Sequence, residues 1–188
     1  MGKKNIRKSV NRFALLGVVM VFVSTNAVSG EMPKNPTIQS GNVTIEGKGT
    51  DHLKIQQKTS KSIINWDSFS VHKGGRVDFN MPSSKSSSLN RVTGSTPSTI
   101  AGQINSNGKV LLINPNGVAI TKNGVVKTGS FAASTLDIKN NDFLQDIYSF
   151  KRKKNSKGVE NSGKIIVGSG GNASLLGAYV DNSGTIMA

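Results

Sequence analysis

The sequence contains no cysteine among its 188 residues, and aromatic side chains make up only 5% of it. The lack of cysteine excludes disulfides and thiolate metal sites, so the fold must gain its stability from packing and hydrogen bonding. With so few aromatic residues, a hydrophobic core must be built mainly from valine, isoleucine and leucine. The two histidines, His52 and His72, are not spaced as a pair of ligands. We therefore expect no metal, no cofactor and no enzymatic activity.

Acidic residues are also scarce, since 10 Asp and Glu stand against 24 Lys and Arg. Five of the basic residues and none of the acids lie at positions 1–29, which leaves 19 − 10 = +9 for the remainder. Part of this surplus is local, in a basic cluster formed by Lys151, Arg152, Lys153, Lys154 and Lys157. Such a cluster can contact polyanions, and a solvated loop is the alternative interpretation. No aromatic platform or recognition helix accompanies it, so nucleic acid is not an expected partner.

A long hydrophobic run is missing as well. The longest apolar stretch, residues 13–23, has eleven residues and is too short to span a bilayer as a helix. It follows a group of basic residues and precedes Ala27-Val28-Ser29, whose small side chains suit cleavage. We interpret residues 1–29 as a Sec-type signal peptide, with an uncleaved anchor as the alternative, and residues 30–188 as one exported domain. The protein then leaves the cytoplasm without stable insertion in a membrane.

What the chain does contain is a series of short apolar runs separated by turns. The clearest turn lies between the runs at residues 110–113 and 118–121, and it consists of Asn114, Pro115, Asn116 and Gly117. The first asparagine can accept hydrogen bonds from the backbone just ahead of it, and the proline fixes φ at the second position. The second asparagine suits the third position, and glycine leaves the turn freely. The pattern predicts a strand, a tight turn and a second strand.

An internal repeat indicates how these strands are arranged. The phrase at residues 161–166 (NSGKII) recurs at residues 182–187 (NSGTIM), an offset of 182 − 161 = 21 positions. A turn followed by a short apolar strand, repeated every twenty or so residues, is typical of one coil of a parallel β-helix. We therefore predict an all-β chain folded as a parallel β-helix. An antiparallel sandwich or barrel is the alternative.

Two further local predictions follow from the sequence. The aromatic residues Trp66, Phe69 and Phe79 predict a local hydrophobic cap over an exposed sheet edge rather than a ligand site. The only helical turn is expected at residues 141–146, and residues 147–150 are a candidate strand before the basic cluster.

Five phrases connect the chain to a known family: residues 63–70 (IINWDSFS), 89–94 (LNRVTG), 97–102 (PSTIAG), 113–118 (INPNGV) and 132–136 (AASTL). In this order they resemble the N-terminal secretion domain of two-partner-secretion exoproteins of the filamentous-haemagglutinin type. The resemblance covers the chain from about residue 38 to its end. It implies a right-handed parallel β-helix with an N-terminal cap and a small extra-helical sheet.

The resemblance also implies a partner and a destination. The partner is a TpsB-type outer-membrane β-barrel transporter, whose periplasmic POTRA domains recognise the unfolded chain. The domain then folds at the cell surface or in the extracellular space of a Gram-negative bacterium. The turn formed by Asn114, Pro115, Asn116 and Gly117 would nucleate the early coils, mark the chain for the transporter, or do both. Strand addition to a sheet edge of the transporter is a physical route to such recognition.

Two further expectations concern an alternative function and the length of the whole protein. The alternative function is a free-standing adhesin module that binds host glycans or other polyanions through the basic cluster. Family members are usually longer, and this chain stops at Ala188 directly after a repeat. We therefore expect a truncated chain or the front of a longer exoprotein.

Overall fold

The computed structural model describes residues 31–152 and 154–188. The predicted signal peptide at residues 1–29, and Lys153 of the basic cluster, lie outside the described residues. Within the described part the chain is built almost entirely of short strands, with one short helix, α1 (Asn140–Leu144). The prediction of an all-β chain is therefore confirmed.

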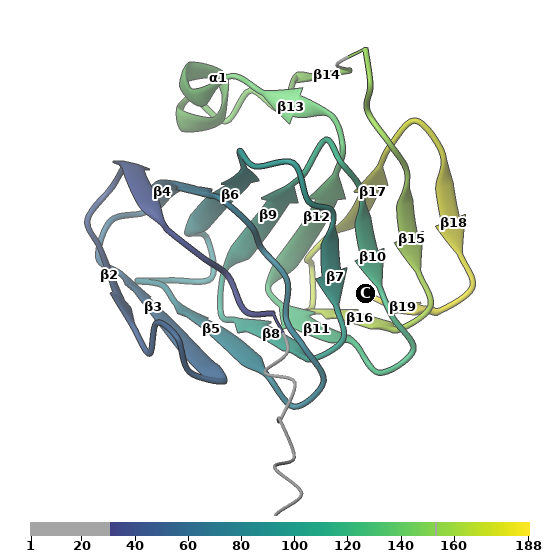
Figure 1. The fold of residues 1–188 in the computed structure, drawn as a ribbon. Helices are drawn as coiled ribbons and strands as arrows, with labels where there is room; N and C mark the ends of the chain where they lie inside the picture. Colours follow the sequence, from purple (N-terminus) through teal and green to yellow (C-terminus); the bar gives the residue numbers. More distant parts are fainter. Residues whose placement is uncertain (1–30, 153) are drawn as a thin grey trace, which may run out of the picture.

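Three long sheets run along the molecule (Figure 1). The six-stranded sheet contains, in spatial order, β1 (Thr37–Ser40), β4 (Lys61–Trp66), β6 (Ser87–Val92), β9 (Lys109–Ile113), β12 (Ser130–Ser134) and β17 (Ala173–Leu176). The seven-stranded sheet contains β2 (Val43–Glu46), β3 (His52–Gln57), β5 (Arg76–Asn80), β8 (Gln103–Ser106), β11 (Val125–Thr128), β16 (Lys164–Val167) and β19 (Thr185–Met187). The four-stranded sheet contains β7 (Ser98–Ile100), β10 (Val118–Ile120), β15 (Val159–Asn161) and β18 (Val180–Asn182).

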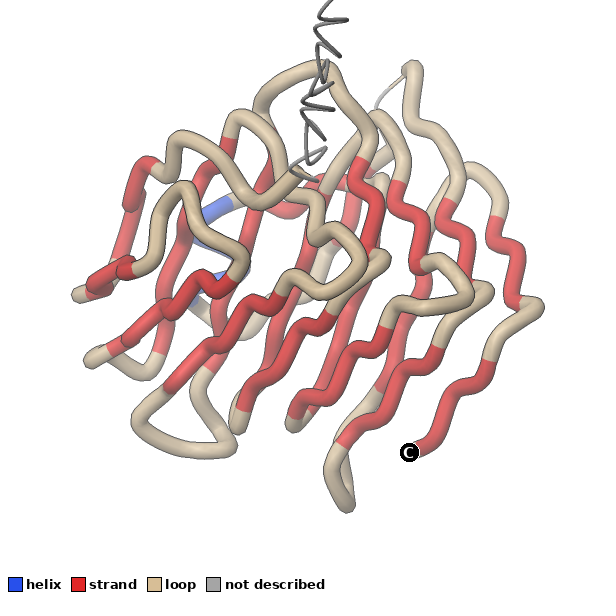
Figure 2. Tube along the Cα trace, turned by 60° about the horizontal axis from the view of Figure 1, so that its bottom comes forward, coloured by secondary structure: helices blue, strands red, loops and turns tan. Residues whose placement is uncertain are grey.

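The chain visits the three sheets in turn and so forms the stacked coils of a parallel β-helix. Figure 2 shows the strands of successive coils side by side, and their pairing is parallel from β3 and β4 onward. Asn161 pairs with Asn182, so the repeated phrase falls on adjacent coils as predicted. At the N-terminal end β1 pairs antiparallel with β4, and β2 pairs antiparallel with β3, which forms the expected cap. The antiparallel sandwich is excluded.

The interior of the β-helix is one continuous hydrophobic cluster. Aliphatic side chains such as Ile104, Val126 and Ile165 pair in register along it and are fully buried. Trp66 and Phe69 belong to the same cluster, with ring centroids 5.3 Å apart in an edge-to-face arrangement. Phe79 is also part of it. The prediction of a separate aromatic cap was wrong, because backbone pairing by β1 and β2 closes this end instead.

A column of glycines marks the corner that precedes successive strands in the later coils of the seven-stranded sheet. Gly102, Gly124, Gly163 and Gly184 stand directly before β8, β11, β16 and β19. A Cβ atom on Gly163 would overlap the carbonyl oxygen of Gly124, and one on Gly184 would overlap that of Gly163. Adjacent coils therefore approach so closely at this corner that only glycine fits.

Replacing Gly163 with alanine should lower the free energy of unfolding by about 1–3 kcal/mol, the usual cost of overpacking an interior. The added methyl group meets two backbone carbonyl oxygens, those of Gly124 and Thr121, which belong to a neighbouring coil and cannot rotate away. Urea unfolding monitored by circular dichroism measures this change. Gly168→Ala is the matched control, because its Cβ would meet only ordinary contacts at 3.7 Å or more. Equal losses in the two variants would show that coil stacking does not require glycine at this corner.

One coil contains an insertion that leaves the β-helix. Val118 of β10 pairs with Val159, and Val159 pairs in turn with Val180, but the first interval along the chain is about twice the second. The extra residues, about as many as one whole coil contains, form an extrahelical layer. This layer consists of β13 (Asp137–Ile138), α1 and β14 (Phe150–Lys151). The layer lies to one side of the coils, at the top of Figure 1. The helical turn is confirmed, but of the candidate strand at residues 147–150 only Phe150 is in a strand.

The extrahelical layer covers a second hydrophobic core on the outer face of the six-stranded sheet. This core unites side chains of the sheet with side chains of the layer: Ile63, Leu89, Leu111, Ile113, Ile138 and Phe143. Within the layer β13 and β14 pair antiparallel, which supplies the small extra-helical sheet that was expected.

Candidate functional site

The Asn-Pro-Asn-Gly turn connects β9 and β10 and has the predicted geometry. The backbone N–H of Gly117 donates to the carbonyl oxygen of Asn114 at 3.1 Å, which closes a four-residue turn. The backbone N–H of Asn116 donates to Oδ1 of Asn114 at 3.0 Å, as expected for an asparagine at the first position. Gly117 has φ = 119°, a value that L-residues rarely adopt.

The side chain of Asn114 is fully buried and fully hydrogen-bonded. Its Nδ2 donates to the carbonyl oxygen of Thr96 and to Oγ of Ser98, both at 2.9 Å. Its Oδ1 accepts from the backbone N–H of Asn116 and from Nδ2 of the same residue, the latter at 3.1 Å. These four contacts use every hydrogen-bonding position of the amide. In the folded domain the side chain of Asn114 therefore has no free donor or acceptor for a partner protein.

The rest of the turn is held between the coils before and after it. Nδ2 of Asn116 donates to the carbonyl oxygen of Gly94 at 2.9 Å, on the preceding coil. The backbone N–H of Lys157 donates to the carbonyl oxygen of Pro115 at 3.0 Å, on the following coil. The turn is thus a structural junction of three coils. A shallow surface groove beside it is lined by Pro97, Asn116, Lys157, Glu160 and Tyr179.

The structure divides the predicted basic cluster into two places. Lys157 lies beside the turn, in contact with Pro115 through its backbone. Lys151 belongs to β14, and Arg152 and Lys154 follow it on the extrahelical layer. All four side chains are exposed, and none of them forms an ion pair among the described residues.

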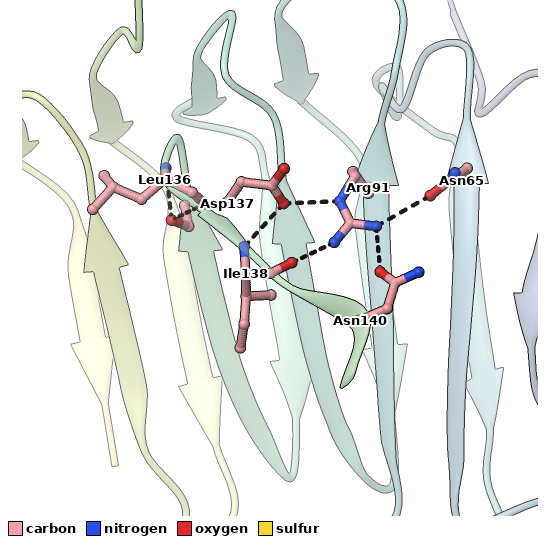
Figure 3. A network of polar contacts seen from close by, with 7 residues as sticks. Asn65, Arg91, Leu136, Asp137, Ile138 and Asn140 are labelled. Atoms are coloured by element: carbon pink, nitrogen blue, oxygen red, sulfur yellow. Dashed lines mark hydrogen bonds and ion pairs between the residues drawn. The ribbon is translucent and has the colours of Figure 1, made fainter. Parts of the chain in front are cut away.

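A network around Arg91 holds the extrahelical layer on the β-helix (Figure 3). Nε of Arg91 donates to Oδ1 of Asp137 at 2.8 Å, and its two terminal nitrogens donate to the carbonyl oxygen of Ile138 at 2.6 Å and to Oδ1 of Asn140 at 2.9 Å. A longer contact of 3.5 Å reaches Oδ1 of Asn65 on β4. The guanidinium group therefore joins two strands of the β-helix to β13 and the start of α1.

Sequence reasoning did not identify Arg91, although it lies within one of the family phrases. Its partners on the layer are 46 to 49 residues away in the sequence, so no local pattern links them. The available signal was an arginine within the strand-like run from Leu89 to Val92, because such a charge is rarely left without a partner.

Lys61 makes a second polar attachment of the layer. Its Nζ donates to the carbonyl oxygens of Phe143 and Leu144 at the end of α1, at 3.3 and 2.8 Å. It also forms an ion pair with Oδ2 of Asp146 at 2.7 Å. The hydrogen bond from Lys61 lowers the pKa of Asp146. Cationic side chains commonly stabilise the last carbonyl groups of a helix in this way.

Among the described residues, each of the two histidines pairs with an aspartate. His52 contacts Asp78 at 2.7 Å and His72 contacts Asp51 at 2.9 Å, so each histidine is held by its own carboxylate. No group of three or more potential metal ligands occurs in residues 31–152 or 154–188. Over the same residues, no helix has the length and apolar character needed to cross a bilayer. The fold and the turn together define a parallel β-helical scaffold whose coils are joined at a hydrogen-bonded turn.

Comparison with known proteins places this scaffold in a family. The model of the TPS secretion domain matches residues 24–188. A heme/hemopexin-binding protein of Haemophilus influenzae is 33% identical over 137 residues, which cover 73% of this chain and 15% of that protein. A heme/hemopexin-binding protein of Haemophilus influenzae strain Rd is also 33% identical, over 69% of this chain and 14% of its own length. The crystal structure of the HMW1 secretion domain from Haemophilus influenzae is 35% identical, with a TM-score of 0.76 over 82% of this chain and 41% of that one.

The chain therefore belongs to the TPS secretion domain family, the secretion domains of two-partner-secretion exoproteins. This family is a secretion and targeting fold rather than a catalytic one. Its exoproteins are secreted across the outer membrane of Gram-negative bacteria, and the domain implies a cognate TpsB outer-membrane transporter as partner. The chain spans about 15% of the length of the curated relatives that it matches.

Proposed function

We propose that residues 30–188 carry the export signal that a TpsB-type transporter recognises, after removal of residues 1–29 as a signal peptide. The periplasmic POTRA domains of the transporter bind the chain before it folds. The domain then forms its β-helix on the far side of the outer membrane. Because the chain spans only a small part of the matched relatives, we assign it the export step and not the activity of a whole exoprotein.

The observation that carries this proposal is the complete burial of Asn114. All four hydrogen-bonding positions of its amide are used within the domain. A partner that recognised this amide in the folded state would have to break those contacts, at a cost of about 1–3 kcal/mol for each buried group left without a partner. The unfolded chain presents the same amide freely. The transporter therefore recognises the Asn-Pro-Asn-Gly motif in the unfolded chain, and the motif closes into a turn only when the domain folds.

The strands suit recognition in an extended form. β3 alternates buried and exposed side chains, and β5 and β11 do so over most of their length. An extended segment of this kind can add to the edge of a sheet in the transporter through its backbone, while alternate side chains supply specificity.

The test compares binding of the unfolded and folded chain to the purified periplasmic domains of a cognate transporter. Chain diluted from urea should bind during the interval before folding, and binding should be lost once the β-helix has formed. Unfolded Asn114→Ser should bind more weakly than the unfolded parent chain. Unfolded Asn123→Ser, which alters an exposed asparagine in another Asn-Gly turn, is the matched control and should bind normally. Equal binding by folded and unfolded chain would refute the proposal.

A second candidate function is contact with host glycans or other polyanions. It is favoured by the exposure of Lys151, Arg152, Lys154 and Lys157, none of which is neutralised by an ion pair within the described residues. If this function is correct, the folded domain should be retained on heparin. Retention should fall when these cations are replaced by glutamine.

A further inference from the structure

The extrahelical layer exposes large apolar side chains in one short segment. The exposed fractions are 39% for Leu144, 48% for Ile147 and 39% for Tyr148. These three residues lie close together in the sequence, from the end of α1 to just before β14. Isolated apolar residues on a surface need no explanation, but such a concentration on a protruding element indicates a contact surface.

Basic residues precede and follow this apolar segment in the sequence. Lys139, Lys151, Arg152 and Lys154 are exposed and form no ion pair among the described residues. The β-helix neutralises two of the three acids of the layer, because Arg91 pairs with Asp137 and Lys61 pairs with Asp146, while no ion pair is formed by Asp142 among the described residues. The outer surface of the layer is therefore cationic as well as apolar.

The underside of the segment adds further apolar surface. An open groove runs between the layer and the six-stranded sheet, lined by Tyr148 and Phe150 on one side and by Leu111, Ala132 and Leu176 on the other. Lys109 stands at this groove, with Nζ 4.9 Å from the centroid of the Tyr148 ring. This contact positions the aromatic ring beside a further cation.

We propose that the extrahelical layer is a membrane-contact surface for an anionic bilayer. Lys139, Lys151, Arg152 and Lys154 bind phosphate groups of the lipid headgroups, and Leu144, Ile147 and Tyr148 enter the headgroup region. A soluble polyanion would be recognised by the cations alone, whereas an anionic bilayer uses cations and exposed apolar side chains together. The coincidence of both on one layer favours the bilayer. The contact is peripheral and holds the folded domain at a membrane surface without spanning it.

The experiment measures sedimentation of the folded mature chain with lipid vesicles. Binding should occur with vesicles of phosphatidylglycerol mixed with phosphatidylcholine, should fall as salt is added, and should be absent with phosphatidylcholine alone. Ile147→Ser combined with Tyr148→Ser should weaken vesicle binding by roughly tenfold, because it removes apolar surface that enters the bilayer. The same pair should leave heparin binding unchanged. Combined replacement of Lys151, Arg152 and Lys154 by glutamine should weaken both.

Tyr179→Ser with Val180→Ser is the matched control. These side chains are also exposed, at 56% and 47%, but lie on the β-helix outside the extrahelical layer, so vesicle binding should not change. Ile147→Asn alone is a second variant, and it removes no side-chain hydrogen bond. A thermal unfolding midpoint equal to that of the parent would show that this variant is folded. Vesicle binding that survives loss of Ile147 and Tyr148 would overturn the proposal, as would binding to heparin without binding to vesicles. Neither result depends on a transporter, so the proposed export function is tested separately.

Discussion

Replacing Asn114 with isoleucine should abolish export of the chain by a cognate outer-membrane transporter. The isoleucine cannot be recognised as the asparagine of the motif, and it also removes all four hydrogen bonds of the buried amide. The carbonyl oxygen of Thr96 and the hydroxyl group of Ser98 then lose a buried partner. We expect the folded domain to lose about 3 kcal/mol or more, at about 1–3 kcal/mol for each unsatisfied group. Co-expression with the transporter, followed by quantification of the chain in the medium, measures export.

A second variant separates recognition from stability in this experiment. Ile165→Ala removes a fully buried side chain from β16, distant in sequence from the turn, and should cost about 2–5 kcal/mol. If the motif is recognised, Ile165→Ala should be exported better than Asn114→Ile at comparable stability. If the two variants are exported equally poorly, the turn acts through folding alone. Equal secretion of Asn114→Ile and the parent chain would remove Asn114 from the export mechanism altogether.

Replacing Arg91 with methionine should release the extrahelical layer from the β-helix. Asp137 would lose the guanidinium group that neutralises it, and the contacts with Ile138 and Asn140 would be lost with it. The Arg91 and Asp137 side chains are only 13% and 21% exposed, so breaking the pair should cost about 3 kcal/mol. Trypsin should then cleave at Lys139, Lys151 or Arg152 at a concentration that leaves the parent domain intact. Mass spectrometry of the fragments identifies the sites, and urea unfolding measures the loss of stability.

Arg76 provides a matched control for this prediction. Its Nε also donates to an aspartate Oδ1, that of Asp78 at 2.7 Å, but its side chain is 51% exposed. Burial would raise the pKa of Asp78, but hydrogen bonds from Arg76, Asn105 and His52 outweigh it and lower the pKa. Asp78 would keep two of these partners, so Arg76→Met should cost less than about 1 kcal/mol, as is usual for exposed ion pairs. Similar losses in the two variants would show that Arg91 has no special role in holding the layer.

The features that the sequence predicted correctly are those determined by neighbouring residues. The turn at Asn114 follows from the φ restriction of proline and the local hydrogen bonds of asparagine. The coil repeat follows from the recurrence of a glycine corner and a short apolar strand, at Gly163 and again at Gly184. Both patterns are complete within a short stretch of chain, so they could be recognised before any tertiary contact was known.

The features that the sequence did not predict depend on contacts between distant segments. Trp66 and Phe69 look like a cap in the sequence, but their burial depends on which coil lies above them. The strand expected at residues 147–150 is confined to its last residue, because the short strand β13 offers little backbone for pairing. Arg91 could not be assigned a partner, since Asp137 reaches it only when the extrahelical layer folds back on the sheet. That insertion becomes evident only from the pairing of β10 with β15 and of β15 with β18.

The burial of Asn114 bears on which chains a transporter could still export. If the transporter recognises the Asn114 amide as proposed, a molecule that folds too early in the periplasm would lose its export signal, because the turn buries that amide. Such a molecule would not compete for the transporter, and its compact β-helix would not block the entrance for later chains. The timing of folding would thus determine which molecules can still be exported, in addition to the final structure of the domain.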